Sequence, residues 1–253
     1  MSVPAALETY YDTVPRASAD VEQVGPFTLF AASDPDGHPF YARPRLGSTH
    51  AFDSDDVALV RARQRELGLP QSLEWVHETT PSLLAAVRST DLDVHECPLL
   101  VLGRAVPAAA PGVTVRVLGP DDDLASMNGA VHAGFGGTDE VVAQPDAQQV
   151  RLVDAGLRVV VAAYDEAGTV LGGGSHSPRD GTTELTGIAV LPRARRVSVG
   201  AAMTAALVAD ALDRGVRTVF LSAQDEDVAR VYERTGFVRV GTAYIAEPPA
   251  VDR

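Results

Sequence analysis

The sequence predicts an α/β fold with a mixed sheet, built as two similar halves. Short runs of β-branched and aromatic residues alternate with segments of helical period along the chain. Residues 103–112 are rich in Ala and Pro, lack an amphipathic period and separate the halves. A shift of 145 residues lays Trp75 on Phe220 and Leu84 on Ala229, so that strand, helix and strand coincide. Duplication and divergence explain this agreement, and chance similarity of two α/β segments is the alternative. We therefore expect domains at 1–103 and 113–253, joined by a linker at 104–112.

The first domain begins with two short strands around the turn at 34–37, and Pro44 restricts the second strand to a sheet edge. Asp53 or Ser54 is suited to cap the helix that follows, and Pro81 opens the next helix at its first turn. The expected strands are 27–32, 40–45, 72–77 and 98–102, and the expected helices are 53–67 and 81–90.

The second domain alternates in the same way. Gly215 and Gly236 end two of its helices, because glycine accepts the left-handed conformation common after a helix. Residues 247–253 are expected to be a frayed tail. The expected strands are 113–118, 158–164, 169–174, 183–190, 218–223 and 237–246, and the expected helical segments are 121–132, 146–155, 198–214 and 225–235.

Composition excludes several classes of protein. Lys+Arg 21 against Asp+Glu 34 gives a net charge of -13, which would repel nucleic acid. This charge mildly favours cationic small molecules, and a soluble acidic protein without such a ligand is the alternative. The single cysteine, Cys97, allows no intrachain disulfide and fits a reducing compartment. We identify neither a leader peptide nor a run approaching the roughly 18 apolar residues that span a bilayer. The expectation is a cytoplasmic protein that binds no nucleic acid and no membrane.

A candidate anion site lies between the strand that ends near Pro192 and the helix that follows. The first turn of a helix carries unpaired N–H groups and partial positive charge, which suit a pyrophosphate. Arg195 and Arg196 add positive charge there, while Gly200 and Ala201 allow close backbone approach. The alternative is a plain strand–loop–helix connection with solvated arginines.

This segment resembles motif A of the GNAT superfamily of N-acetyltransferases, with Arg195, Ser198 and Gly200 at the signature positions Arg/Gln-x-x-Gly-x-Gly/Ala. Residues 225–237 resemble motif B, a helix that carries a tyrosine and closes with Gly-Phe. The resemblance covers about residues 113–246. Ser198 departs from the signature glycine, and Asp225 stands where the family often has asparagine.

The resemblance implies two tandem domains of the acyl-CoA N-acyltransferase type, the first one degenerate, with acetyl-CoA as the acyl donor and no metal. Ser198 is small and can adopt the helical conformation at the helix start, so it need not abolish binding; hydrogen bonding to a phosphate and weaker coenzyme affinity are the two alternatives for its effect. The residues implied to bind the coenzyme are Ile188, Ala189, Val190, Arg195, Arg196, Val197, Ser198, Val199, Gly200, Ala201 and Asp225.

The resemblance also implies catalytic roles. Tyr232 matches the motif B tyrosine that protonates the departing thiolate, and a packed core tyrosine is the alternative. Glu184 resembles the glutamate that acts as general base in the histone-acetylating branch, and a structural edge glutamate is the alternative. His176, beside three glycines, is either a second candidate base or a hydrogen-bonded structural histidine. A relayed water is the third candidate for the base.

Other polar residues are expected to be structural. His132 is expected only to shape the acceptor region, and the three aspartates 121–123 to cap a helix rather than bind metal. In the first domain Val87 takes the place of Tyr232 and Asp55 that of Gly200, so that domain is expected to bind no CoA.

The resulting hypothesis is an N-acetyltransferase that moves an acetyl group from acetyl-CoA to the primary amine of a small molecule or peptide. The alternatives are an acyl-CoA-binding pseudoenzyme or sensor and a structural scaffold without ligand. Homodimerisation stays open.

Overall fold

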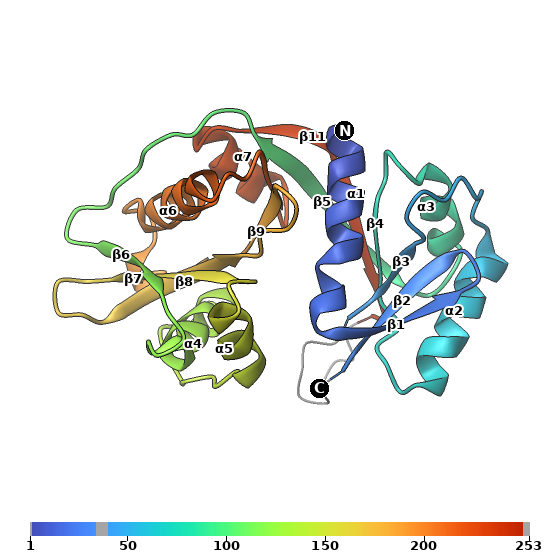
Figure 1. Ribbon diagram of the computed structural model, residues 1–253, viewed down its shortest axis with the longest axis horizontal. Helices are drawn as coiled ribbons and strands as arrows, with labels where there is room; N and C mark the ends of the chain where they lie inside the picture. The colour runs from blue at the N-terminus through green and yellow to red at the C-terminus, as the bar shows by residue number, and fades with distance from the viewer. Residues whose placement is uncertain (1, 34–39, 250–253) are drawn as a thin grey trace. The chain divides into compact units, whose positions relative to one another are not determined.

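The computed structural model of the 253-residue chain describes residues 2–33 and 40–249 (Figure 1). The predicted turn at 34–37 and the last four residues of the predicted tail lie outside this part. The helices are α1 (Val3–Thr13), α2 (Ser54–Glu66), α3 (Pro81–Arg88), α4 (Leu124–Phe135), α5 (Ala147–Asp154), α6 (Val199–Asp213) and α7 (Glu226–Arg234). The strands are β1 (Ala19–Val24), β2 (Phe27–Ala32), β3 (Ala42–Pro44), β4 (Leu73–Val76), β5 (Asp93–Leu102), β6 (Thr114–Leu118), β7 (Val159–Tyr164), β8 (Val170–His176), β9 (Thr182–Val190), β10 (Thr218–Ser222) and β11 (Phe237–Glu247).

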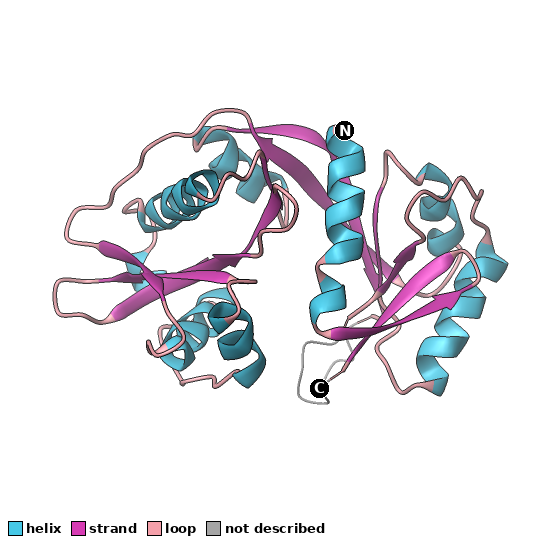
Figure 2. Ribbon diagram, in the orientation of Figure 1, coloured by secondary structure: helices cyan, strands magenta, loops and turns pink. Residues whose placement is uncertain are grey.

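The elements form a mixed α/β architecture (Figure 2), as the sequence predicts. The chain divides into two compact units whose bounds differ from the predicted domains. The first unit contains the residues up to Leu99 together with Ser222–Ala229 and those from Arg239 onward. The second contains Leu100–Leu221 and Arg230–Val238.

The first unit has the strand order β1-β2-β3-β4-β11-β5. Its core packs Trp75 of β4 and Tyr244 of β11 with apolar residues of α2 and α3, and the two rings lie 5.2 Å apart between centroids. The prediction that Pro44 restricts its strand to an edge is wrong, because β3 lies between β2 and β4. Only Ala42 of β3 is in register with β4, so the missing N–H of Pro44 falls beyond that pairing.

The second unit has the strand order β10-β9-β8-β7-β6, with β9 and β10 parallel and the other pairs antiparallel. Helices α4 and α6 cover opposite faces of this sheet (Figure 1). The glycines of β8 permit this close packing, because a Cβ on Gly173 would meet Met127 of α4 and one on Gly174 would meet Leu207 of α6. The helices on both faces therefore pack closely against these glycines.

The internal repeat is confirmed element by element. With the shift of 145 residues, the first residues of α2 and α6 coincide, as do those of β4 and β10 and those of α3 and α7. The last residues of β5 and β11, Leu102 and Glu247, also coincide. The agreement of bounds over four elements favours duplication over chance.

None of the described helices is long and apolar enough to cross a membrane.

Candidate functional site

The site in the second unit begins where two parallel strands separate. The pairing of β9 with β10 joins Thr182 to Thr218 and ends with Glu184 opposite Phe220. β9 continues for six residues beyond Glu184, to Val190, without a register partner on β10. Unpaired backbone groups on a strand edge are ready to bind a ligand. Glu184 is half-buried and stands at the last paired position, where this opening begins.

A bulge lies within the diverging part of β9. Gly173 of β8 is in register with Ala189, but Ser175 is in register with Thr186, so β9 has one extra residue between the pairs. Gly187 has φ +62°, the left-handed conformation that glycine adopts readily at bulges. The bulge changes the direction of the backbone just before Ile188, the first of the residues predicted to bind the coenzyme. Gly187 is not among the residues predicted for the site, although a glycine inside a strand pattern is a signal for a bulge.

The loop between β9 and α6 presents a continuous row of backbone donors. Arg196 and Ser198 both have φ +66°, which is a left-handed conformation, and Val197 lies between them. Within the described chain, no backbone acceptor pairs with the N–H groups of residues 196–201. Successive N–H groups in such a conformation form an anion-binding concavity, and the positive end of the α6 dipole adds to it. The residues predicted to bind phosphate therefore present their backbone N–H groups as one row of donors.

The two predicted phosphate-binding arginines differ in their surroundings. Arg195 donates from Nε to the carbonyl oxygen of Val190 at 3.0 Å and from Nη2 to that of Gly134 at 2.6 Å. Its guanidinium thus joins the basic loop to the end of α4. Arg196 is exposed and has no partner in the described part of the chain. Arg196 is therefore the side chain available to a bound phosphate.

The backbone at Ser198 differs from the prediction. The sequence predicts a helical conformation, but the residue has φ +66° and ψ 11° and stands immediately before α6. The prediction was wrong because the chain must reverse direction between β9 and α6, and this turn overrides the local preference of serine. A non-glycine residue in this conformation costs roughly 1–2 kcal/mol. Its side chain makes no capping hydrogen bond.

Tyr232 lies on α7, and its ring packs edge-on against Phe237 with centroids 6.0 Å apart. Burial raises the pKa of Tyr232 to about 12, because the charged phenolate would be poorly solvated there. The phenol therefore keeps its proton at neutral pH. A proton donor requires this, and a packed core tyrosine would share it.

His176 is fully buried and has a partner at each ring nitrogen. Nδ1 lies 3.1 Å from Thr183 Oγ1, and Nε2 lies 3.0 Å from Asp210 Oδ1 on α6. Burial lowers the pKa of His176, and the hydrogen bond to Asp210 opposes this in part. These contacts favour the structural interpretation of His176 over that of a second candidate base.

Two of the aspartates singled out in the sequence cap helices. Asp123 accepts a hydrogen bond from Ser126 N at 2.9 Å at the start of α4, which confirms its predicted role. Asp225 accepts one from Val228 N at 2.8 Å at the start of α7. Its carboxylate thus has a structural partner. His132 is exposed on α4.

The first unit has an internal anion at the equivalent position. The shift of 145 residues places Asp53 at the position of Ser198, and Asp53 caps α2. Its Oδ1 accepts hydrogen bonds from Asp55 N at 2.9 Å and Asp56 N at 3.1 Å, while Asp56 in turn accepts from Asp53 N. Carboxylates thus already occupy the helix N-terminus where an anion would bind, and they would repel a phosphate.

Comparison with protein families agrees with this geometry. Residues 133–237 match the model of the acetyltransferase (GNAT) family. This range holds the bulged strand, the donor row of residues 196–201 and Tyr232. A comparison with curated proteins gave no match.

Solved structures resemble nearly the whole chain. A GCN5-related N-acetyltransferase from Kribbella flavida superposes with a TM-score of 0.76 at 22% identity, covering 99% of this chain and 97% of that one. One from Sphaerobacter thermophilus gives a TM-score of 0.62 at 18% identity, covering 98% and 87%. A tandem GNAT protein from the clavulanic acid biosynthesis pathway gives 0.55 at 19% identity, covering 89% and 80%. The chain thus has the fold of these GCN5-related and tandem GNAT proteins, and residues 133–237 match the acetyltransferase (GNAT) family.

Proposed function

We propose that this protein transfers an acetyl group from acetyl-CoA to a primary amine by direct attack, with residues 113–253 as the catalytic domain. The observation that carries the proposal is the row of N–H groups at residues 196–201, which have no backbone acceptor among the described residues, together with the exposed side chain of Arg196. This row begins six residues after Val190, where the diverging β9 ends. A pyrophosphate on the row would leave the extended part of the coenzyme free to follow β9.

The reacting groups would follow β9. A primary amine has a pKa of about 10.4 and is protonated at neutral pH, so a base must remove a proton before attack. Glu184 is the proposed base, since it lies at the start of the opening between β9 and β10. The backbone of Ile188–Val190 is the proposed donor to the oxyanion that forms when nitrogen attacks the thioester carbon.

Tyr232 is the proposed donor to the departing sulfur. As the C–S bond breaks, the phenol donates a hydrogen bond or its proton to the thiolate, and the amide and CoA are released. A phenol with a pKa of about 12 is a weaker acid than a thiol with a pKa of about 8.5, so hydrogen bonding to the sulfur comes first.

An acceptor screen monitored by CoA release tests the proposal. Wild type should release CoA with at least one class of primary amine, and Tyr232→Phe should release it far more slowly while binding acetyl-CoA equally well. Tight acetyl-CoA binding without turnover on any amine would instead support the acyl-CoA-binding pseudoenzyme. Absence of acetyl-CoA binding would contradict both functions.

A further inference from the structure

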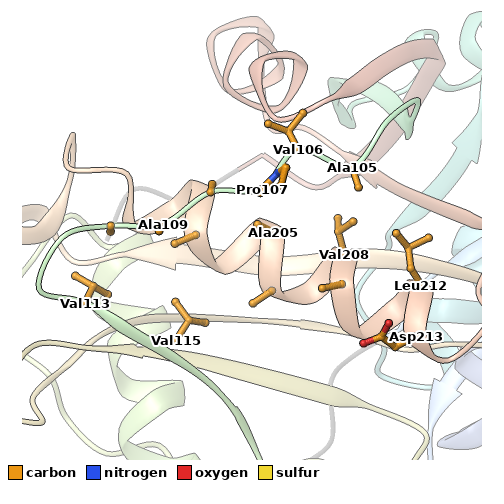
Figure 3. Close-up of a pocket in the computed structure, with 15 residues that line it drawn as sticks. Ala105, Val106, Pro107, Ala109, Val113, Val115, Ala205, Val208, Leu212 and Asp213 are labelled. Carbon is orange, nitrogen blue, oxygen red and sulfur yellow. The ribbon is translucent and has the colours of Figure 1, made fainter.

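An apolar groove lies on the outer side of α6, away from the face of that helix that covers the sheet (Figure 3). It has a volume of about 570 Å³ and lies between α6, the first part of β6 and the linker residues 105–110. Ala205, Val208 and Leu212 of α6 point toward the linker. This volume falls within the range of pockets that bind small molecules, about 300–1,000 Å³.

The sequence of α6 explains why the groove exists. A surface helix normally carries polar residues on its outer face, but α6 has only three polar side chains after its first turn. Thr204 bonds back to Gly200 O, and Asp210 pairs with His176 and Arg214. The outer face is therefore a row of alanines with Leu212, which stays 43% exposed. Small side chains here leave room that the linker does not fill.

The only charged group in the lining is Asp213, at the last residue of α6. Within the described residues Asp213 has no hydrogen-bond or ion-pair partner, and the adjacent Arg214 is engaged by Asp210. A carboxylate at a helix C-terminus adds to the negative end of the helix dipole, so a cation placed there gains from both. The net charge of -13 further favours a cation.

From these observations we infer that the groove binds a small amphipathic amine. Its apolar body lies along the alanines of α6 beneath the linker, and its ammonium group lies beside Asp213. A neutral apolar molecule would leave Asp213 unpaired, and an anionic one would be repelled by it. This site is separate from the proposed acetyl transfer, because it uses the outer face of α6 rather than the N–H groups at its start.

Fluorescence titration with dansylcadaverine, an apolar ring system bearing a primary amine, tests this inference in the full chain without acyl-CoA. N-acetyl-dansylcadaverine, which has the same body without the charge, is the matched neutral probe. Ala209→Leu fills the groove from an exposed position. Ala147→Leu makes the same change at an exposed position of α5, outside the groove. Asp213→Asn removes only the charge.

We expect the cationic probe to bind wild type with one-to-one stoichiometry and at least tenfold more weakly to Ala209→Leu. Ala147→Leu should bind it like wild type. Because an exposed ion pair contributes at most about 1 kcal/mol, Asp213→Asn should weaken the cationic probe by about two- to fivefold and leave the neutral probe unchanged. Equal binding to wild type and a folded Ala209→Leu, equal binding of both probes to wild type, or no saturable binding would each overturn the inference. Circular dichroism establishes that each variant is folded.

Discussion

The guanidinium of Arg195 donates a hydrogen bond to the carbonyl oxygen of Gly134 at 2.6 Å and thereby joins two segments 61 residues apart. Gly134 also lies against the end of β9, since a Cβ there would be 3.1 Å from the Cβ of Ala189. Arg195 therefore stabilises the packing of α4 against the strand that the coenzyme would follow. Arg196, one residue later, makes no such hydrogen bond within the described part of the chain.

Replacing each of the two arginines by alanine should consequently have a different effect. Arg196→Ala should weaken CoA binding about fivefold to tenfold with an unchanged melting temperature, because it removes an exposed phosphate partner. Arg195→Ala should lower the free energy of unfolding by about 1 kcal/mol, because it removes hydrogen bonds to two backbone carbonyls. Calorimetric CoA titration and thermal unfolding of both variants measure this. A melting temperature lowered only in Arg196→Ala would reverse the assignment.

Replacing Ser198 by glycine should stabilise the protein. Glycine accepts φ +66° without steric cost, so Ser198→Gly should raise the free energy of unfolding by about 1 kcal/mol and preserve CoA affinity. Ser126→Gly, within the ordinary helical backbone of α4, is the control and should destabilise instead. Urea denaturation compares the variants. A large loss of CoA affinity in Ser198→Gly would show that the hydroxyl itself binds the ligand.

Tyr232→Phe should reduce turnover about 10²- to 10⁴-fold while leaving acetyl-CoA affinity nearly unchanged, because only the proton donor is lost. Since burial raises the pKa of Tyr232 to about 12, the pH–rate profile of wild type should show no basic limb from this residue below about pH 11. Single-turnover kinetics at several pH values measure both effects. Full activity of the variant would leave Tyr232 as a packing residue.

Glu184→Gln should lower turnover most at neutral pH and recover in part at high pH, where more of the amine is already unprotonated. The same pH–rate profile measures this. An unchanged profile would assign proton removal to a water molecule, because His176 is held on both ring nitrogens.

The buried His176 should make stability depend on pH. Its pKa is lowered in the folded state, whereas in the unfolded chain it is about 6.5, so the unfolded state takes up the proton first as pH falls. Its contribution is fully present above about pH 6.5 and is lost below. His176→Gln should flatten the decline in unfolding free energy between about pH 7 and pH 5. The control His132→Gln, at an exposed residue, should retain the slope of wild type.

The first unit should bind no coenzyme, because Asp53 and Asp56 already satisfy the start of α2. Titration calorimetry should give one CoA per chain. A stoichiometry of two would show that the capping carboxylates can be displaced.

Local elements of this fold follow from sequence alone, as the bounds of α2, β10 and α7 show. Their signals are local: helical period, a capping Asp53 and terminal glycines. Helix α1 and strand β1 were not predicted. The interior position of β3 could not be predicted from the sequence either, since strand order depends on pairings between distant residues.

The same distinction applies to the site. The basic loop and the helix start could be predicted from residue types and spacing. The partner of Arg195 could not, because Gly134 lies far away in sequence. The left-handed conformation of Ser198 differs from the local preference of serine, because the turn around this residue determines it.

The return of the final strand to the first unit constrains how the chain can acquire its structure during synthesis. Tyr244 and Ala246 belong to the apolar core of that unit, and β11 pairs with β4 from Leu73 to Val76. An emerging polypeptide therefore cannot complete its first unit until residues 243–246 have been translated. Until then β4 lacks this neighbour, so the nascent first unit would expose an open sheet edge. Translation arrest before residue 243 should leave that unit sensitive to protease on the ribosome.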